Sequence, residues 1–297
     1  MAICTKIPKI TRMHAFPNSA YGLFKAALKS AEGLYPLHEA EAVSYRVVEE
    51  FSGMTMTDIM ADKPFIANSE DIIRWQEVLH RLRKNEPVQY IFNRAWFYER
   101  PFYVNPSVLI PRQETEELVF SALELLKPGM TVLDIGTGSG CIPITLKLEA
   151  PDIRAEGCDI SVESLEVAKK NAAQLNAQVD FFKLDILNDQ LQANKYNLLI
   201  SNPPYVTEGE KAQIKREVLE WEPHQALFVT DQDPLLFYKK IAKVGKYFLD
   251  SGGHLLFEIN ERFGKEVVHV LESTGYKEVQ RIKDLNGKDR IVKGICI

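Results

Sequence analysis

The stretch VLDIGTGSG, residues 132–140, decides the fold. Its apolar beginning is typical of a buried strand, and glycines at 136, 138 and 140 allow a tight turn with positive φ before a helix begins. Dinucleotide-binding folds place G-x-G-x-x-G at such a turn, where a pyrophosphate meets the helix N-terminus. Here the spacing is G-x-G-x-G, with Asp134 two residues before the first glycine. The stretch therefore predicts a strand, a ligand-binding turn and a helix.

Asp134 indicates the charge of the ligand. A carboxylate beside the loop repels a pyrophosphate, but it can accept hydrogen bonds from a cationic ligand or form an ion pair with it. S-adenosylmethionine carries a sulfonium and an ammonium and no phosphate, so it fits this loop better than NAD. We expect this cofactor to contact Asp134, Gly136, Thr137, Gly138, Ser139 and Gly140.

Apolar strand candidates and helical patterns alternate along the rest of the chain. The strand candidates lie at 131–135, 154–158, 179–184, 197–201 and 254–258, with a final pair at 278–283 and 290–295. Ser161 is a plausible N-cap for one of the helices between them. The alternation predicts an α/β, Rossmann-like domain with a mostly parallel seven-stranded sheet, and the final pair predicts an antiparallel edge hairpin.

Two further acidic residues follow strands of this sheet. Asp159 ends the second strand, 19 residues after Gly140, where a carboxylate can bind ribose hydroxyls. Asp185 ends the third strand, and we expect it to lie beside the adenine. An Asp after a strand is often only a helix cap, but ligands in such sheets bind at the carboxyl ends of the strands. Three strand ends in succession favour a cofactor site.

The stretch SNPPYV, residues 201–206, ends the fourth strand at the same edge. The Asn202 side chain offers one acceptor and two donors. Pro203 and Pro204 fix φ and remove two backbone donors, which leaves carbonyls free as acceptors. Tyr205 supplies a flat face. We expect these four residues to receive a planar group with an NH₂ and to position it for methylation.

The N-terminal third has a different pattern. Apolar residues recur at steps of three and four from 18 to 85, and Asn68 with Asp71 predicts an N-cap for the last helix. The aromatic-rich residues 94–105 predict a β-hairpin that turns at Glu99-Arg100-Pro101. We expect a flexible tail at 1–17, a helical bundle at 18–88, a β-hairpin linker at 89–112 and the cofactor-binding domain at 113–297.

Composition limits the partners and the compartment. With 36 Lys and Arg against 41 Asp and Glu, the net charge is −5. The chain therefore lacks the excess of basic residues that is typical of a nucleic-acid binder, but the composition does not exclude a local basic patch. The four cysteines, Cys4, Cys141, Cys158 and Cys296, are scattered, which argues against a zinc site or a disulfide framework and fits a reducing cytoplasm. No apolar run reaches the roughly 18 residues that span a bilayer. We expect a cytoplasmic monomer without a metal.

With these residues, the chain from about residue 20 resembles the HemK/PrmC family of protein N5-glutamine methyltransferases. The resemblance rests on the segment 86–119 with LIPRQETEELV, on LDIGTGSG and SNPPYV, and on WEPHQAL, GGHLLFE and DLNGKDR. It implies methyl transfer from S-adenosylmethionine to the glutamine of the Gly-Gly-Gln motif in peptide chain release factors. It also implies that the helical domain helps to grip the release factor. Ile186 stands where many relatives have an aromatic residue, and Gln113 where many have proline.

Two other functions stay open from the residues alone. The Asn-Pro-Pro-Tyr corner also resembles the motif of enzymes that methylate amino groups of adenine or guanine in RNA or DNA, which would need a basic track to the site. A catalytically silent methyltransferase-like binding module would be expected to have lost the glycines or Asn202, and both are intact. The loop spacing and Asp134 disfavour a nicotinamide dehydrogenase.

Overall fold

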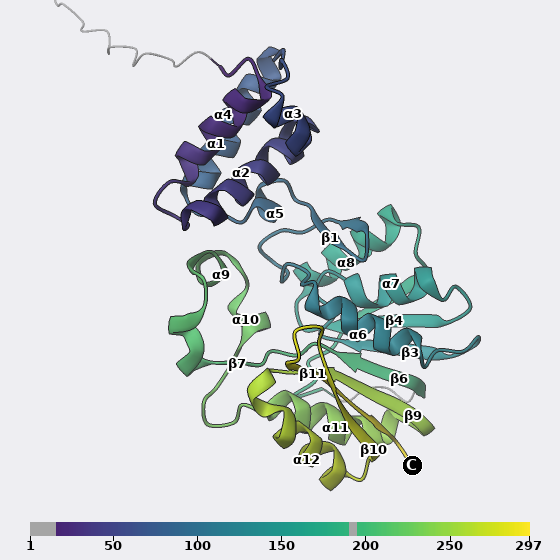
Figure 1. Cartoon of the computed structure of the whole chain (residues 1–297). Helices are drawn as coiled ribbons and strands as arrows, with labels where there is room; N and C mark the ends of the chain where they lie inside the picture. The colour runs from purple at the N-terminus through teal and green to yellow at the C-terminus, as the bar shows by residue number, and fades with distance from the viewer. Residues whose placement is uncertain (1–15, 190–194) are drawn as a thin grey trace, which may run out of the picture. The chain divides into compact units, whose positions relative to one another are not determined.

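The computed structural model describes residues 16–189 and 195–297, and the chain divides into two compact units after Phe92. Figure 1 shows the elements of both units in colours that follow the chain. The tail expected at 1–17 lies almost wholly outside the described residues. Each unit has its own core, so each is described by itself.

The first unit is a bundle of helices (Figure 1). Its elements are α1 (Ala20–Ala31), α2 (Leu37–Ser52), α3 (Met56–Met60), α4 (Ser69–Arg83) and α5 (Val88–Ile91). They bury one continuous apolar cluster that includes Leu23, Val47, Trp75 and Leu82. The predicted N-cap is confirmed, because Asn68 and Asp71 form a reciprocal capping box at the start of α4.

Arg81 fixes the end of this unit. Its guanidinium donates to both carboxylate oxygens of Glu86 and to the carbonyls of Tyr90 and Ile91. These bonds tie α5 back to α4, so the short helix belongs to the bundle. The boundary therefore lies at Phe92, a few residues after the end of the bundle that the sequence predicts.

The second unit contains the seven-stranded sheet, in the order β10-β11-β9-β6-β3-β4-β5. The parallel strands are β3 (Thr131–Ile135), β4 (Arg154–Asp159), β5 (Val179–Lys183), β6 (Tyr196–Ser201) and β9 (Leu249–Glu258). β10 (Lys277–Lys283) and β11 (Asp289–Ile295) form the antiparallel edge hairpin. The predicted α/β architecture is confirmed.

Helices cover both faces of the sheet (Figure 1). One face packs against α6 (Glu114–Leu123), α7 (Cys141–Glu149) and α8 (Val162–Gln174), and the other against α11 (Leu236–Phe248) and α12 (Gly264–Thr274). Alternate residues of each strand serve the two cores: in β6, Leu199 lies in one cluster, whereas Leu198 and Ile200 lie in the other. The side chains of the central strands are therefore apolar on both faces, which is typical of a parallel sheet.

The predicted β-hairpin is present, but the predicted position of its turn is wrong. Its strands are β1 (Ala95–Phe97) and β2 (Arg100–Phe102), so Tyr98 and Glu99 form the turn. Both turn residues have positive φ, as a two-residue hairpin turn requires. Proline cannot adopt a positive φ, and Pro101 instead pairs with Trp96 in the two-stranded sheet. Phe97 and Phe102 are buried in the core of the second unit.

A run of short elements separates β6 from α11. It comprises β7 (Val206–Thr207), the 3₁₀ helix η1 (Glu208–Gln213), α9 (Arg216–Trp221), α10 (His224–Leu227) and β8 (Phe228–Val229). A second 3₁₀ helix, η2 (Glu261–Phe263), follows β9. The buried Glu222 fastens the first run to the segment before α6: its carboxylate accepts from the backbone N–H of Ile110 at 3.1 Å and from Arg112 at 2.6 Å.

Candidate active site

The order of the strands creates the site. The chain builds β3, β4 and β5 outward in one direction and then returns to place β6 on the other side of β3. Leu133 pairs with Leu199 and Asp134 with Ile200, so the two strands end at the same edge. Ligands bind at such a switch point, outside the carboxyl ends of the strands. The glycine loop after β3 and the Asn-Pro-Pro-Tyr corner after β6 therefore meet.

The three glycines of the loop have different surroundings. All have positive φ: 78° at Gly136, 53° at Gly138 and 78° at Gly140. A Cβ at Gly136 or Gly138 would meet nothing within 4 Å, whereas one at Gly140 would lie 3.0 Å from Ala168 and Ile144. The first two glycines thus border open space that a ligand can enter, and the third permits close packing of the loop against the helices.

Asp134 is fully buried behind this loop. Neither of its carboxylate oxygens has a hydrogen-bond partner among the described residues. Burial raises the pKa of Asp134 to about 7, the nearby Asp159 carboxylate adds to the rise, and the Thr137 hydroxyl opposes it. A buried carboxylate without hydrogen-bond partners lowers the stability of the fold. Asp134 is therefore a candidate for a functional role.

Asp159 lies at the end of β4, next to the loop. One oxygen accepts from the backbone N–H of Gly138 and the other from that of Ser161, each at 2.9 Å. Burial raises the pKa of Asp159, while these backbone hydrogen bonds oppose the rise. Each oxygen keeps a lone pair for a further donor, such as a hydroxyl. Ser161 caps α8 as predicted, since its hydroxyl accepts from the Ser164 N–H.

Asp185 and Ile186 follow β5, where the sequence predicts an adenine contact. The Asp185 carboxylate accepts from the side chain of Asn188 and from the backbone N–H of Leu187, and the hydrogen bond from Asn188 is the main reason for its lowered pKa. Ile186 is half-buried and packs against the core that α11 and α12 cover. A role of these two residues in cofactor binding stays a prediction.

Asn202 is held by a threonine from another part of the chain. Its Nδ2 donates to the Thr115 hydroxyl at 3.2 Å, and that hydroxyl donates to Glu258 at 2.7 Å. Thr115 lies in the first turn of α6, and Glu258 ends β9. The corner therefore receives support from two neighbouring elements.

Tyr205 is anchored to the same carboxylate. Its hydroxyl donates to Glu258 at 3.1 Å, its ring packs against the core, and the Asn260 side chain donates to its backbone carbonyl at 3.2 Å. Burial is the main cause of a strongly raised pKa at Tyr205, so its hydroxyl is protonated and acts as a donor. Pro203 is buried and Pro204 half-buried between these two anchored residues.

Comparison with known proteins identifies the family. A family model for the PrmC N-terminal domain matches residues 21–92, and one for the methyltransferase small domain matches residues 115–226. The release factor glutamine methyltransferase of Bacteroides thetaiotaomicron is 43% identical over 265 residues, which cover 89% of this chain and 95% of that protein. This chain belongs to the release factor glutamine methyltransferase family. The relative from Flavobacterium psychrophilum is 38% identical, with 90% of this chain and 95% of that protein covered.

Solved structures support the fold of this family member. A methyltransferase from Pyrococcus furiosus matches with a TM-score of 0.50 and 16% identity over 76% of this chain and 99% of that one. The 16S rRNA N2 G1207 methyltransferase of T. thermophilus matches with a TM-score of 0.50 and 15% identity over 69% of this chain and 50% of that one. These likenesses show a methyltransferase fold. No helix in the described part of the chain is long and apolar enough to cross a membrane.

The site residues fit the cofactor expected of a methyltransferase. The partnerless carboxylate of Asp134 offers buried acceptors for a cationic ligand, as the sequence predicts. Gly136 and Gly138 leave space in front of the loop, and Asp159 keeps acceptor capacity for hydroxyls. These observations match S-adenosylmethionine, which combines positive charge with ribose hydroxyls.

Sequence reasoning missed three residues that shape the site. Thr115 and Arg112 lie in the LIPRQETEELV segment, and Glu258 ends GGHLLFE; both motifs carried the family resemblance, but no role was assigned to these residues. Their contacts reach over large separations, since Thr115 and its partner Glu258 are 143 positions apart in the sequence. The signal that could have found Glu258 is a carboxylate at the end of an otherwise apolar strand.

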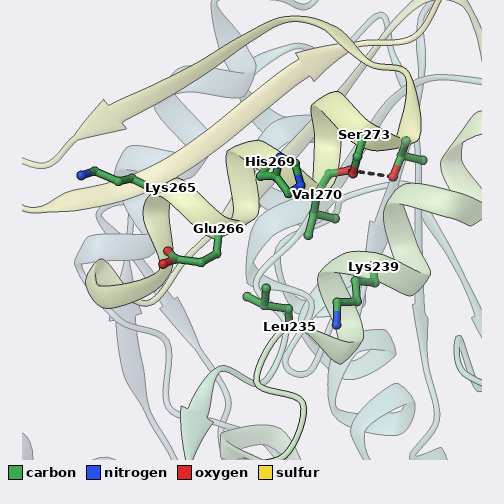
Figure 2. A pocket seen from close by; sticks show the side chains of 8 residues that line it. Leu235, Lys239, Lys265, Glu266, His269, Val270 and Ser273 are labelled. Carbon is green, nitrogen blue, oxygen red and sulfur yellow. Dashed lines mark hydrogen bonds between the residues drawn. The ribbon is translucent and has the colours of Figure 1, made fainter.

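One cavity of the second unit lies elsewhere (Figure 2). It has a volume of about 550 Å³ and is formed by the start of α11 and one side of α12. Its lining residues are Leu235, Lys239, Lys265, Glu266, His269, Val270, Ser273 and Thr274. None of the predicted site residues is among them, so this cavity is separate from the candidate active site.

Proposed function

We propose that this protein transfers a methyl group from S-adenosylmethionine to the side-chain amide nitrogen of the glutamine in the Gly-Gly-Gln motif of peptide chain release factors. The observation that carries the proposal is the arrangement at Asn202. Its amide nitrogen already donates to Thr115, so its oxygen remains as the acceptor for a substrate N–H. The names of its relatives point to the same substrate, since each is a release factor glutamine methyltransferase.

The corner suits the chemistry of an amide. An amide nitrogen is a poor nucleophile because its lone pair is delocalised into the carbonyl. If the Asn202 side-chain oxygen and the Pro203 carbonyl accept its two N–H groups, the lone pair is directed toward the methyl donor. Both acceptors bind more strongly as positive charge develops on the nitrogen, so they stabilise the transition state more than the ground state. Tyr205 packs against the planar group and Pro204 stiffens the corner.

The cofactor residues have separate tasks in this proposal. When bound, S-adenosylmethionine supplies an electrophilic methyl group on a positively charged sulfur. Asp134 offers buried negative charge, the glycine loop lets the backbone approach, and Asp159 accepts from ribose hydroxyls. Asp185 and Ile186 border the adenine, and Asn202 contacts cofactor and substrate.

Proton transfer needs no strong base in this site. After methyl transfer the amide nitrogen carries the methyl group and both of its protons, so it is cationic and acidic enough to lose one of these protons to water. Glu258 is buried behind Thr115 and Tyr205, so it is not placed to take the proton. The protein residues position and polarise the substrate.

We assign recognition of the release factor to the helical unit. It matches the PrmC N-terminal domain, and it exposes the apolar side chains of Leu37, Met60, Ile66 and Ile73. We further propose a cytoplasmic monomer whose only macromolecular partners are class 1 release factors, with no direct nucleic-acid contact.

Labelled methyl transfer tests the function. The full chain is incubated with S-adenosylmethionine labelled on its methyl group and, separately, with purified release factor and with total RNA. We expect label on the Gly-Gly-Gln glutamine, located by mass spectrometry of the digested release factor. Label found on RNA alone would show instead that the corner serves a nucleobase amino group.

Asn202→Ala is the matched variant for this assay. It removes the proposed acceptor, so transfer to the glutamine should be lost while thermal unfolding stays cooperative. Wild-type turnover by this variant would refute the assignment of Asn202.

A further inference from the structure

A single buried carboxylate organises both functional side chains of the corner. Glu258, only 1% exposed, accepts from the Thr115 hydroxyl through Oε2 and from the Tyr205 hydroxyl through Oε1. The Thr115 hydroxyl in turn accepts from Asn202 Nδ2 at 3.2 Å. Three separate segments meet here: the first turn of α6, the corner after β6 and the end of β9.

The chemistry of the three groups fixes which of them donates in the series of hydrogen bonds from Asn202 to Thr115 to Glu258. An ionised carboxylate only accepts, and a hydroxyl has one proton to donate. The Thr115 proton is directed at Glu258, so the hydroxyl can only accept on its other side. Asn202 must therefore present its NH₂ to Thr115 and turn its oxygen away. Shape alone would not select this orientation, because the two ends of an amide are almost the same size.

We propose that Glu258 and Thr115 are positioning residues for the methyl transfer, which hold the Asn202 amide in the one orientation that offers its oxygen to the substrate amide. Glu258 also fixes the Tyr205 ring through its hydroxyl. This inference rests on the proposed function, because it assigns the oxygen of Asn202 to a substrate N–H. The reversed amide would present two donors to a group that itself donates.

The charges around Glu258 support this order. The positive charge of Arg290 on β11 favours the ionised form of Glu258, and the negative charge of Glu114 on α6 disfavours it. The Tyr238 hydroxyl of α11 donates to the Glu258 backbone carbonyl. Burial raises the pKa of Glu258, and the hydrogen bond from Thr115, the charge of Arg290 and the hydrogen bond from Tyr205 oppose the rise. The carboxylate form thus has specific partners that stabilise it.

Thr115→Val is the direct test. Valine keeps the shape of threonine but can neither accept from Asn202 nor donate to Glu258, so the amide is free to reverse. We expect kcat for methylation of release factor to fall about 10- to 100-fold, as is common when a group that orients a functional side chain is removed. The affinity for S-adenosylmethionine, measured by calorimetry, should fall much less than kcat, because Asn202 is only one of several residues that contact the cofactor. Thr115→Ser keeps the hydroxyl and should restore most of kcat.

Two further variants separate orientation from packing. Thr145 is also fully buried, in α7, and its hydroxyl has no hydrogen-bond partner among the described residues. Thr145→Val therefore makes the same buried exchange without touching the chain of hydrogen bonds, and kcat should stay unchanged. Glu258→Gln introduces a donor that can reverse the order, and kcat should fall as in Thr115→Val.

A readout independent of turnover comes from the Asn202 side chain itself. In nitrogen-15 NMR spectra of the wild type, its NH₂ group should show slow hydrogen exchange, because one proton is bonded to Thr115. This protection should vanish in Thr115→Val and persist in Thr115→Ser.

The outcomes separate the inference from the function on which it rests. Absence of wild-type methylation of release factor refutes the proposed function, whereas the NMR comparison still tests the order of the hydrogen bonds. Wild-type kcat in a folded Thr115→Val protein overturns the inference alone. An equal loss in Thr115→Ser also overturns it, because the serine keeps the hydroxyl.

Discussion

The buried charge of a single residue, Asp134, favours ligand binding and lowers the stability of the ligand-free fold. Its carboxylate is fully buried and has no hydrogen-bond partner among the residues that the structure describes. A cationic ligand would supply the missing partner, so the charge serves binding. In the ligand-free protein the same charge destabilises the fold.

The stability of the ligand-free protein should therefore depend on pH through Asp134. The pKa of its carboxyl is about 7 in the folded protein, above the value of about 3.9 in an unfolded chain. The folded state thus binds the proton more tightly, and the free energy of unfolding falls as pH rises between these two values. Asp134→Asn cannot titrate, so from about pH 5 to about pH 8 it should gain roughly 1–3 kcal/mol relative to the wild type. Urea unfolding at both pH values measures this gain.

An exposed carboxylate provides the control for this measurement. Asp180 lies on β5, with a side chain that is 79% exposed. Asp180→Asn should leave the pH dependence of unfolding as it is in the wild type. A difference between Asp134→Asn and the wild type that is the same at both pH values would contradict the assignment.

The residue types and their positions indicate candidates for contact with cofactor and substrate, but they do not indicate the residues that hold those side chains in place. Asn202, Asp134 and Asp159 are candidates from the sequence because each lies at or beside the end of an apolar strand, and the ends of parallel strands meet at one edge. Thr115 and Glu258 could not be assigned, since neither occupies a position whose local pattern points to the corner. Only the packing of α6 and β9 around β6 brings them together.

At the level of elements, Glu222 joins the run of short elements that follows the corner to the segment before α6. It is buried at the end of α9 and binds the backbone of Ile110 and the side chain of Arg112. Glu222→Gln removes the charge and one acceptor, which leaves a buried donor without its partner. We expect a loss of about 1–3 kcal/mol in the free energy of unfolding, measured by urea denaturation.

Glu220 is the matched control in the same short helix. Its side chain is 40% exposed and forms an i,i+4 ion pair with Arg216 at 2.7 Å. Exposed pairs of this kind contribute about 0.5 kcal/mol or less, so Glu220→Gln should have almost no effect. Equal losses in the two variants would show that Glu222 does not fasten the segments.

The elements that could be predicted are the long periodic ones. Strands such as β3 and β6 are apolar and bounded by turns, and the cap at Asn68 has a local signature. β7 and β8 have two residues each and α10 has four, so each is too short to repeat the period of its own structure. The predicted position of the hairpin turn is too far toward the C-terminus. Proline is a common turn residue, so Pro101 favours that position, whereas the observed turn needs two residues with positive φ.

At the scale of the whole molecule, each unit has its own core. The helical unit buries its own apolar cluster, and the second unit contains the full sheet with the predicted cofactor and amide sites. Cofactor binding should therefore be a property of residues 93–297 alone. Recognition of a large protein substrate should require both units.

A fragment of residues 93–297 tests this division. We expect it to bind S-adenosylmethionine as the full chain does and to methylate a short Gly-Gly-Gln peptide at the same rate. Its KM for intact release factor should rise about tenfold or more, which corresponds to at least about 1.4 kcal/mol of lost binding. Steady-state kinetics on both substrates measure this split. Equal KM values for intact release factor would assign recognition to the second unit.

The division into two units was visible in the sequence, but its boundary was not. The helical period ends near residue 85, and the aromatic run that follows predicts a β-hairpin linker. Arg81 holds α5 in the first unit through backbone carbonyls, and Phe97 and Phe102 are buried in the second. Neither contact leaves a signal in the periodicity of the chain, so the sequence alone does not show to which unit the residues of 89–112 belong.

The unequal surroundings of the three loop glycines bear on how such a protein can change over evolutionary time. A side chain at Gly136 or Gly138 meets open space, so the fold can tolerate it at the cost of the strained backbone, roughly 1–2 kcal/mol. One at Gly140 meets Ala168, Ile144 and Phe181, so it also disturbs the packing of the domain. A duplicated copy released from selection for methylation could lose either of the first two glycines and persist as a folded protein. Gly140 would stay under selection for as long as the fold itself is used.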